Sequence, residues 1–99
     1  MLNQAILVGR VWDMDATDYI IVSVPRSFKN ADGEYDNDMI KVTLEGTINS
    51  NTREYCHKGD TIGIRGRLQT STYEVDKVKR KVVEIIVEKL TFLSSKKPE

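Results

Sequence analysis

Aromatic and basic side chains lie close together at two points in this sequence of 99 residues. Phe28 lies between Arg26 and Lys29, and Tyr73 comes shortly before a basic stretch at residues 77–81. Aromatic rings can stack on nucleobases while neighbouring cations hold the phosphates. An aromatic residue near the end of a strand can instead cover the hydrophobic core. Each of the two rings therefore has a binding interpretation and a packing interpretation.

Further basic residues extend these two groups, and one acidic stretch opposes them. The candidate phosphate ligands are Arg26, Lys29, Lys41, Arg67, Lys79 and Arg80. A run of charges is usually a solvated loop, so the basic stretch also has a purely structural interpretation. Residues 32–38 (DGEYDND) would repel a phosphate backbone. They are typical of a solvated hairpin tip, or they could contact a basic partner.

The sequence offers little for nucleophilic chemistry. Cys56 and His57 are adjacent, and neighbouring side chains on a helix point about 100° apart, so they cannot easily form a hydrogen-bonded pair. The sequence has no second histidine, no phosphate-binding glycine loop and too few cysteines and histidines for a structural zinc. We therefore expect no enzyme, no catalytic residue, no cofactor and no metal site.

The formal charges sum to zero, which argues against a strongly basic nucleic-acid-binding protein. Fifteen Lys and Arg balance fifteen Asp and Glu. The distribution is uneven, because residues 1–60 have six basic and ten acidic side chains, a net charge of −4, whereas residues 61–99 have nine and five, a net charge of +4. The C-terminal part can therefore still present a basic face.

Five segments rich in Val and Ile predict β-strands, and one segment between the third and fourth predicts a helix. The strands are expected at residues 4–11, 19–24, 39–44, 61–68 and 82–90. The helix is expected within residues 46–60, about two turns long, with Asn49 or Ser50 as its N-cap and Gly59 at its C-terminal end. The polar segments 29–38 and 70–81 are expected to be long hairpin loops, the first of which turns at residues 31–33.

The first and third strands differ in their alternation. Residues 40, 42 and 44 of the third strand are apolar, whereas Met39, Lys41 and Glu45 lie on the other face, which should meet water or a ligand. Both faces of the first strand are apolar, so a second surface should cover it. Either a partner subunit or the interior of the same chain would serve.

This order of elements is that of an OB-fold, an all-β, five-stranded Greek-key barrel with one short helix between strands three and four. The length suits one such domain, expected at residues 1–93 and followed by a short polar tail at residues 94–99. OB-folds bind oligonucleotides or oligosaccharides, but a fold alone does not assign a function.

Three segments resemble the bacterial and phage single-stranded DNA-binding protein (SSB) family, and they follow the family's order. They are residues 3–11 (NQAILVGRV), 54–59 (EYCHKG) and 62–73 (IGIRGRLQTSTY), and the likeness extends over residues 2–93. The resemblance implies an OB-fold that assembles as a homotetramer or a homodimer and binds single-stranded DNA without sequence preference. It also implies that catalysis and cofactors are absent.

The resemblance further implies site residues. Phe28 falls where the family has a stacking tryptophan, and Tyr73 falls on another aromatic position. Met39 and Glu45 replace two further aromatics, and since Glu45 repels phosphate and cannot stack, binding per subunit should be weaker than is usual in the family.

Trp12, just after the first strand, could project into the binding groove, or it could be a core or subunit contact.

The expected function is therefore to bind and protect single-stranded DNA during DNA replication, repair or recombination. The single cysteine and the lack of a signal peptide or membrane span favour the cytoplasm, where replication or recombination proteins are further candidate partners. The SSB family usually continues into a disordered linker and an acidic tail, so either this sequence is truncated or it does not recruit partners in that way. Two alternatives stay open: an accessory OB-fold similar to primosomal replication protein B, which bridges replication proteins, and an oligomeric scaffold that has lost DNA binding.

Overall fold

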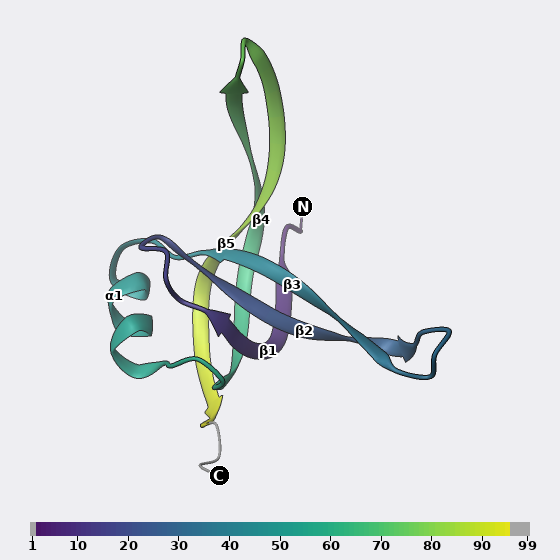
Figure 1. Ribbon diagram of the computed structural model, residues 1–99. Helices are drawn as coiled ribbons and strands as arrows, with labels where there is room; N and C mark the ends of the chain where they lie inside the picture. The colour runs from purple at the N-terminus through teal and green to yellow at the C-terminus, as the bar shows by residue number, and fades with distance from the viewer. Residues whose placement is uncertain (1, 96–99) are drawn as a thin grey trace.

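The chain folds into a closed five-stranded barrel with one helix beside it (Figure 1). The computed structural model describes residues 2–95. Its elements are β1 (Ala5–Asp13), β2 (Tyr19–Lys29), β3 (Tyr35–Thr43), α1 (Gly46–Tyr55), β4 (Thr61–Val75) and β5 (Val78–Ser94). The strands are hydrogen-bonded in the order β1-β2-β3-β5-β4, and β4 closes the barrel on β1. The expected OB-fold is confirmed, and of the expected tail at residues 94–99 only Ser94 and Ser95 lie within the described residues.

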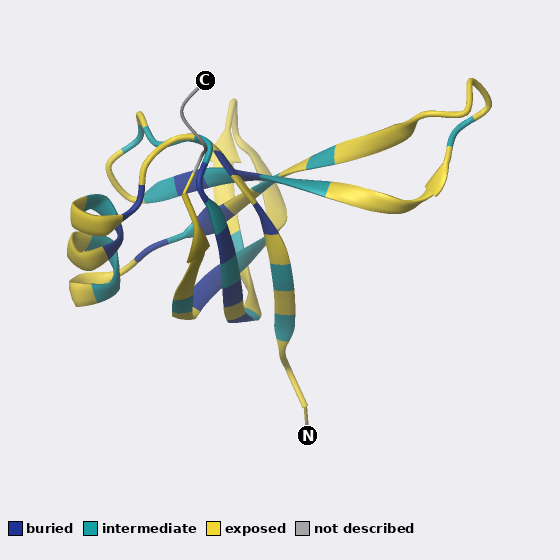
Figure 2. Cartoon of the chain, turned by 90° about the horizontal axis from the view of Figure 1, so that it is seen from below, coloured by how far each residue is buried: buried dark blue, intermediate teal, exposed yellow. Residues whose placement is uncertain are grey.

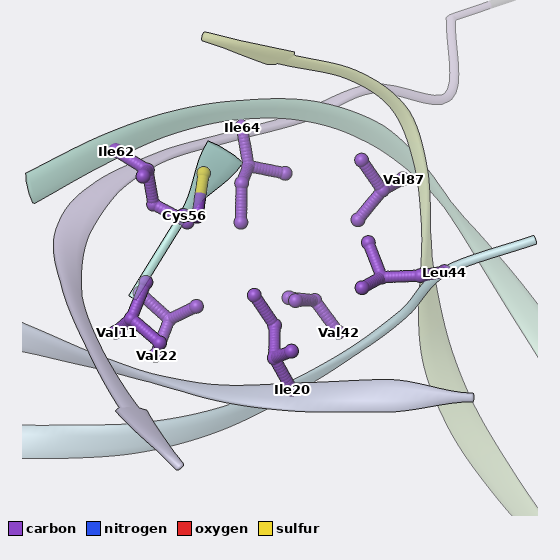
Figure 3. Close-up of a cluster of buried hydrophobic side chains, with 9 residues drawn as sticks. All are labelled: Val11, Ile20, Val22, Val42, Leu44, Cys56, Ile62, Ile64 and Val87. Carbon is purple, nitrogen blue, oxygen red and sulfur yellow. The ribbon is translucent and has the colours of Figure 1, made fainter. Parts of the chain in front are cut away.

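The core consists of alternate side chains that point into the barrel (Figure 3). Every strand contributes to it, because side chains of a strand alternate between its two faces. Its members are Val11, Ile20, Val22, Val42, Leu44, Cys56, Ile62, Ile64 and Val87. The alternation predicted for the third strand is confirmed by Val42 and Leu44, which are buried, and by Met39 and Lys41, which are exposed.

Two hairpins extend far beyond the barrel. We call them the β2–β3 arm, residues 25–37, and the β4–β5 arm, residues 69–84, and Figure 1 shows that they project in different directions. Almost all of their residues are exposed (Figure 2). The radius of gyration is therefore 15.1 Å, compared with about 13 Å for a compact chain of this length.

The long loops predicted at residues 29–38 and 70–81 are wrong, because strand pairing continues almost to each tip. From Gly66 onward the β4–β5 ladder keeps one register to Val75 opposite Val78. Asp76 and Lys77 make the whole turn with φ of 51° and 65°, the backbone of a two-residue type I′ hairpin. The β2–β3 arm turns at residues 31–33 as expected, where Gly33 has a φ of 78°.

The helix begins earlier than predicted and differs at both ends. Its N-cap is Glu45, whose side chain makes no capping hydrogen bond. Since β3 ends at Thr43, the prediction that Glu45 lies on the outer face of that strand is wrong. Asn49 does not cap the helix, because its amide donates to the carbonyl of Thr17 at 2.8 Å. The helix ends at Tyr55 with Cys56 as its C-cap, so Gly59 lies in the following turn and not at the helix end.

Arg53 ties the helix to the loop between β1 and β2. Its guanidinium donates to the carbonyls of Met14 at 2.8 Å, Tyr19 at 3.3 Å and Ala16. It also donates to the side chain of Asn49 at 2.9 Å. One half-buried cation therefore satisfies two carbonyls of this loop and that of the first residue of β2.

Gly66 is required where the backbone of β4 approaches that of β5 closely. A Cβ at this position would overlap the carbonyl oxygen of Ile86, whereas a Cβ at Gly63 would lie 3.7 Å from Leu93, an ordinary contact. Two glycines of one strand thus differ in whether the fold needs them.

We expect Gly66→Ala to lower the free energy of unfolding by about 1–3 kcal/mol, because the backbone of β5 must shift to admit the methyl group. Gly63→Ala is the matched control and should change it by less than about 0.5 kcal/mol. Urea titration followed by circular dichroism measures both. Equal effects of the two substitutions would contradict the close approach.

Candidate nucleic-acid interface

Eight of the ten candidate residues are distributed over three surfaces, and Arg67 and Trp12 lie apart from them. Arg26, Phe28 and Lys29 lie on the β2–β3 arm, and Tyr73, Lys79 and Arg80 lie on the β4–β5 arm. Met39 and Lys41 lie on the outer face of β3, on the barrel itself. The structure therefore separates Phe28 from Tyr73, which belong to different arms (Figure 1).

Arg26 is held by acidic neighbours on its own arm. Its Nε lies 3.2 Å from both carboxylate oxygens of Asp38, and its Nη2 donates to Asp38 Oδ1 at 2.9 Å. Asp36 lies 3.9 Å away on the same guanidinium. The hydrogen bond with Asp38 raises the pKa of Arg26 and lowers the pKa of Asp38, which keeps both groups charged. Of the basic candidates, Arg26 thus has the shortest ion pair, since Arg67 lies 4.0 Å from Glu88.

Phe28 lies within β2 and not after it, and 65% of its surface is exposed. The pairing of β2 with β3 shifts between Pro25 and Lys29, so Phe28 belongs to an irregular part of the strand. The next residue, Lys29, pairs with Tyr35 and places its ammonium 5.9 Å from the centre of that ring. The packing interpretation of Phe28 is wrong for the described residues, since the ring does not cover the core.

Met39 and Lys41 share the outer face of β3, as the alternation predicts. Met39 is opposite Ser23 on β2, and Lys41 is opposite Ile21. The ammonium of Lys41 lies 4.5 Å from the centre of the Tyr19 ring, a cation–π contact. Asp38, which holds Arg26, is the neighbour of Met39 along the strand and therefore points to the opposite face.

Two aromatic residues near these candidates are not among those expected from the sequence. Tyr19 is half-buried beside Lys41, and Tyr35 is exposed beside Lys29. Tyr35 is separated from Met39 by four positions of one strand and so shares its face. That spacing could have identified it, but the acidic residues around it suggested a loop.

Tyr73 is oriented by a carboxylate on the neighbouring strand. Its hydroxyl donates to Glu84 Oε1 at 2.9 Å, and the hydroxyl of Ser71 donates to Glu84 Oε2 at 3.0 Å. The hydrogen bond to Glu84, together with the negative charge of that group, raises the pKa of Tyr73. The ring nevertheless remains 46% exposed. Tyr73 is therefore a fixed aromatic surface and not a lid on the core.

The cations of the β4–β5 arm lie on both of its faces. Arg80 is directly opposite Tyr73 and shares its face. Lys79 is opposite Glu74 and lies on the other face. Arg67, at the base of the arm, donates to Gln69 at 3.0 Å and lies 4.0 Å from Glu88. Arg80 is thus the basic candidate that the structure brings closest to an aromatic candidate on this arm.

Trp12 lies in the strand and not beyond it. The register between β1 and β2 shifts between Val11 and Asp13, so Trp12 is the extra residue of a β-bulge. Its side chain is 61% exposed, which excludes the core interpretation within residues 2–95. A binding role and a subunit contact remain as interpretations.

The described part of the chain offers little support for nucleophilic chemistry or metal binding. Cys56 is buried in the core, and this burial, with a smaller effect of Asp60, raises the pKa of its thiol. The side chain of His57 is exposed and lies 3.8 Å from Asp60. Among residues 2–95 there is no group of three or more side chains suited to hold a metal ion, and no helix is long and apolar enough to cross a membrane.

Comparisons with known proteins agree with this architecture. Residues 2–93 match the model of the single-strand binding protein family. Single-stranded DNA-binding protein B of Bacillus subtilis is 38% identical over all of this chain and 96% of its own length. Single-stranded DNA-binding protein 1 of Clostridium acetobutylicum is 32% identical over 97% of each chain.

Two solved structures share the fold. The Plasmodium falciparum SSB complex with ssDNA has a TM-score of 0.73 at 20% identity and covers 95% of this chain and 96% of its own. A small single-stranded DNA-binding protein from Streptomyces coelicolor has a TM-score of 0.64 at 16% identity, covering 93% and 95%. On the family match and the sequence identity, the chain belongs to the single-strand binding protein family.

Proposed function

We propose that this chain binds single-stranded DNA without sequence preference, in the cytoplasm and without catalysis, during replication, repair or recombination. The observation that best supports the proposal is the exposure of Phe28 and Tyr73 on two separate arms, each with a cation nearby. An exposed ring on a soluble protein adds no core stability, whereas stacking of a base on it contributes about 1–3 kcal/mol. Family membership and relatives named for single-stranded DNA binding support the same function, and nothing among these findings favours an accessory bridging role.

In this proposal bases stack on Phe28 and Tyr73, and Met39 offers an apolar contact between them on the barrel. Lys29, Lys41 and Arg80 would meet the phosphates. Arg67 and Lys79 would do so as well, but Arg26 would contribute little, since Asp38 already balances its charge. Residues 69–84 have four basic side chains against three acidic ones, so neither arm is strongly basic. Stacking should therefore account for more of the affinity than charge does.

We further propose that the chain assembles with copies of itself through the outer face of β1. Ile6 and Val8 lie on this face and are 70% and 54% exposed, so the chain's own described residues do not cover it. β1 pairs with β2 only between Arg10 and Asp13, which leaves the backbone edge before Arg10 open on that side. An apolar face beside an open strand edge is a typical site of self-association. A homotetramer or homodimer would also multiply the number of arms per assembly.

One prediction of this proposal concerns how the affinity for DNA depends on salt concentration. Affinity for a dye-labelled oligo-dT, measured by fluorescence anisotropy, should fall roughly 100-fold between 50 and 200 mM salt, as about five phosphate contacts would give. A strongly basic protein with about ten contacts to the same single strand would lose about 10⁴-fold. Absence of binding at low salt, or binding that salt does not change, would overturn the proposed function.

The second prediction concerns the two rings. Phe28→Ala and Tyr73→Ala should each weaken oligo-dT binding at least about fivefold, the effect of losing one stacked base. Tyr73→Phe keeps the ring and should stay within about twofold. Tyr55→Ala removes an aromatic that is exposed on α1, away from both arms, and serves as the matched control. Unchanged affinity in both arm variants would show that the rings are not the binding surface.

The third prediction concerns assembly. Val8→Glu should shift the chain to monomers in multi-angle light scattering, because it places a charge in the apolar interface. Val83→Glu, an equally drastic change at an exposed position of the β4–β5 arm, is the control and should leave the mass unchanged. A monomeric unmodified chain, or an oligomer that tolerates Val8→Glu, would contradict the proposal.

A further inference from the structure

An open hollow lies on the outer face of the barrel, between β1 and the root of the β2–β3 arm. Its volume is about 430 Å³, within the range of roughly 300–1,000 Å³ of small-ligand sites. Trp12 and Arg10 of β1, Ser23 of β2, Asn37 of β3 and Thr61 of β4 contribute to its lining. Four strands therefore contribute to one concave surface, and of the candidate site residues identified in the sequence it includes only Trp12.

The pairing of the strands explains why these side chains converge. Arg10 is opposite Ser23 on one side and opposite Thr61 on the other, so the three residues form a row across the sheet. Ser23 is in turn opposite Met39. Directly paired residues share a face of the sheet, so the hollow is continuous with the outer surface of Met39 and Lys41. A strand of nucleic acid that follows that surface would reach the hollow without crossing the barrel.

Trp12 is directed to this place by the β-bulge. Bulges re-aim a side chain and occur frequently next to binding sites. The neighbouring Gly9, which also lines the hollow, lets the backbones of β1 and β2 approach closely, since a Cβ there would overlap the carbonyl oxygen of Ser23. The indole is thus a large exposed aromatic wall beside a hollow, and not a ring packed against its own chain.

The polar side chains named above as lining the hollow make no ion pair or hydrogen bond within the described residues. Within residues 2–95 the guanidinium of Arg10 has no ion-pair partner, in contrast to Arg26. In the same part of the chain the side chains of Ser23, Asn37 and Thr61 make no hydrogen bond to protein. A hydroxyl and an amide can each donate and accept, so together they can satisfy the edge of any base. An aromatic wall, one free cation and adaptable polar groups are the combination that an unpaired nucleotide requires.

We propose that the hollow binds one nucleotide of the single strand, with its base stacked on Trp12 and its phosphate held by Arg10. This inference rests on the proposed function and adds to it a stacking site on β1 that lies apart from both arms. It would compensate for the missing aromatics at Met39 and Glu45. Val8 also lines the hollow, so the proposed subunit contact at Ile6 and Val8 borders this site, and the nucleotide would lie at the edge of that contact.

The test uses the fact that Trp12 is the single tryptophan of the sequence. Its intrinsic fluorescence therefore reports on the hollow alone, while anisotropy of dye-labelled oligo-dT reports on binding anywhere. We expect quenching of Trp12 with the same midpoint as the anisotropy change. Anisotropy binding with unquenched Trp12 would overturn the inference and leave the proposed function intact, whereas no anisotropy change would overturn both.

Two substitutions separate the ligand from a second copy. Trp12→Ser should weaken binding at least about fivefold, and Arg10→Gln should weaken it and reduce the salt slope by about one contact. Tyr55→Ser, at an exposed aromatic on α1, should have no effect. Affinity of Trp12→Ser within twofold of the unmodified chain would overturn the inference. A lower mass of Trp12→Ser in light scattering would also overturn it, because the hollow would then be a subunit contact.

Discussion

The barrel depends on a narrow closure between β3 and β5. These two strands run parallel and pair only at Val42 with Ile85 and at Thr43 with Ile86. On the arm side of these pairs, β3 pairs only with β2, and β5 pairs only with β4. The two arms are therefore the continuation of the hairpins past the closure. Their separation follows from the same fact, since each leaves the barrel on its own side of the closing pair.

The electrostatics of the chain follow from where its charges are paired. The charge of Arg26 is balanced by Asp38, and Arg67 lies 4.0 Å from Glu88. The hydroxyl of Tyr73 donates a hydrogen bond to Glu84. Lys29, Lys41, Arg80 and Arg10 have no such carboxylate among the described residues. The zero net charge thus conceals a small set of free cations beside exposed rings. A surface of that kind suits a ligand that offers many aromatic faces and a regular series of phosphates.

The order of strands and helix and the core-facing side of the third strand could be predicted from the sequence, because both depend on local patterns of Val, Ile and alternation. The lengths of the hairpins could not, since polar residues such as those at 70–74 pair as well as apolar ones when both faces of an arm are solvated. The helix start was misplaced because Asn49, a strong N-cap type, bonds to Thr17, which is distant in sequence. The pairing of Arg26 and the bulge at Trp12 likewise depend on strand register, which sequence patterns do not specify.

The exposed, two-stranded nature of the arms has a further consequence for how the molecule moves. Residues 70–82 include only one half-buried side chain, Ser71, so almost no apolar contact opposes local fraying of that arm. Segments of this kind open with free energies far below that of global unfolding, and their amide protons exchange accordingly early. Contact with a ligand would restrict these motions, so part of the gross interaction energy is offset by lost conformational entropy. The rigid barrel face around Trp12 has no comparable freedom to lose.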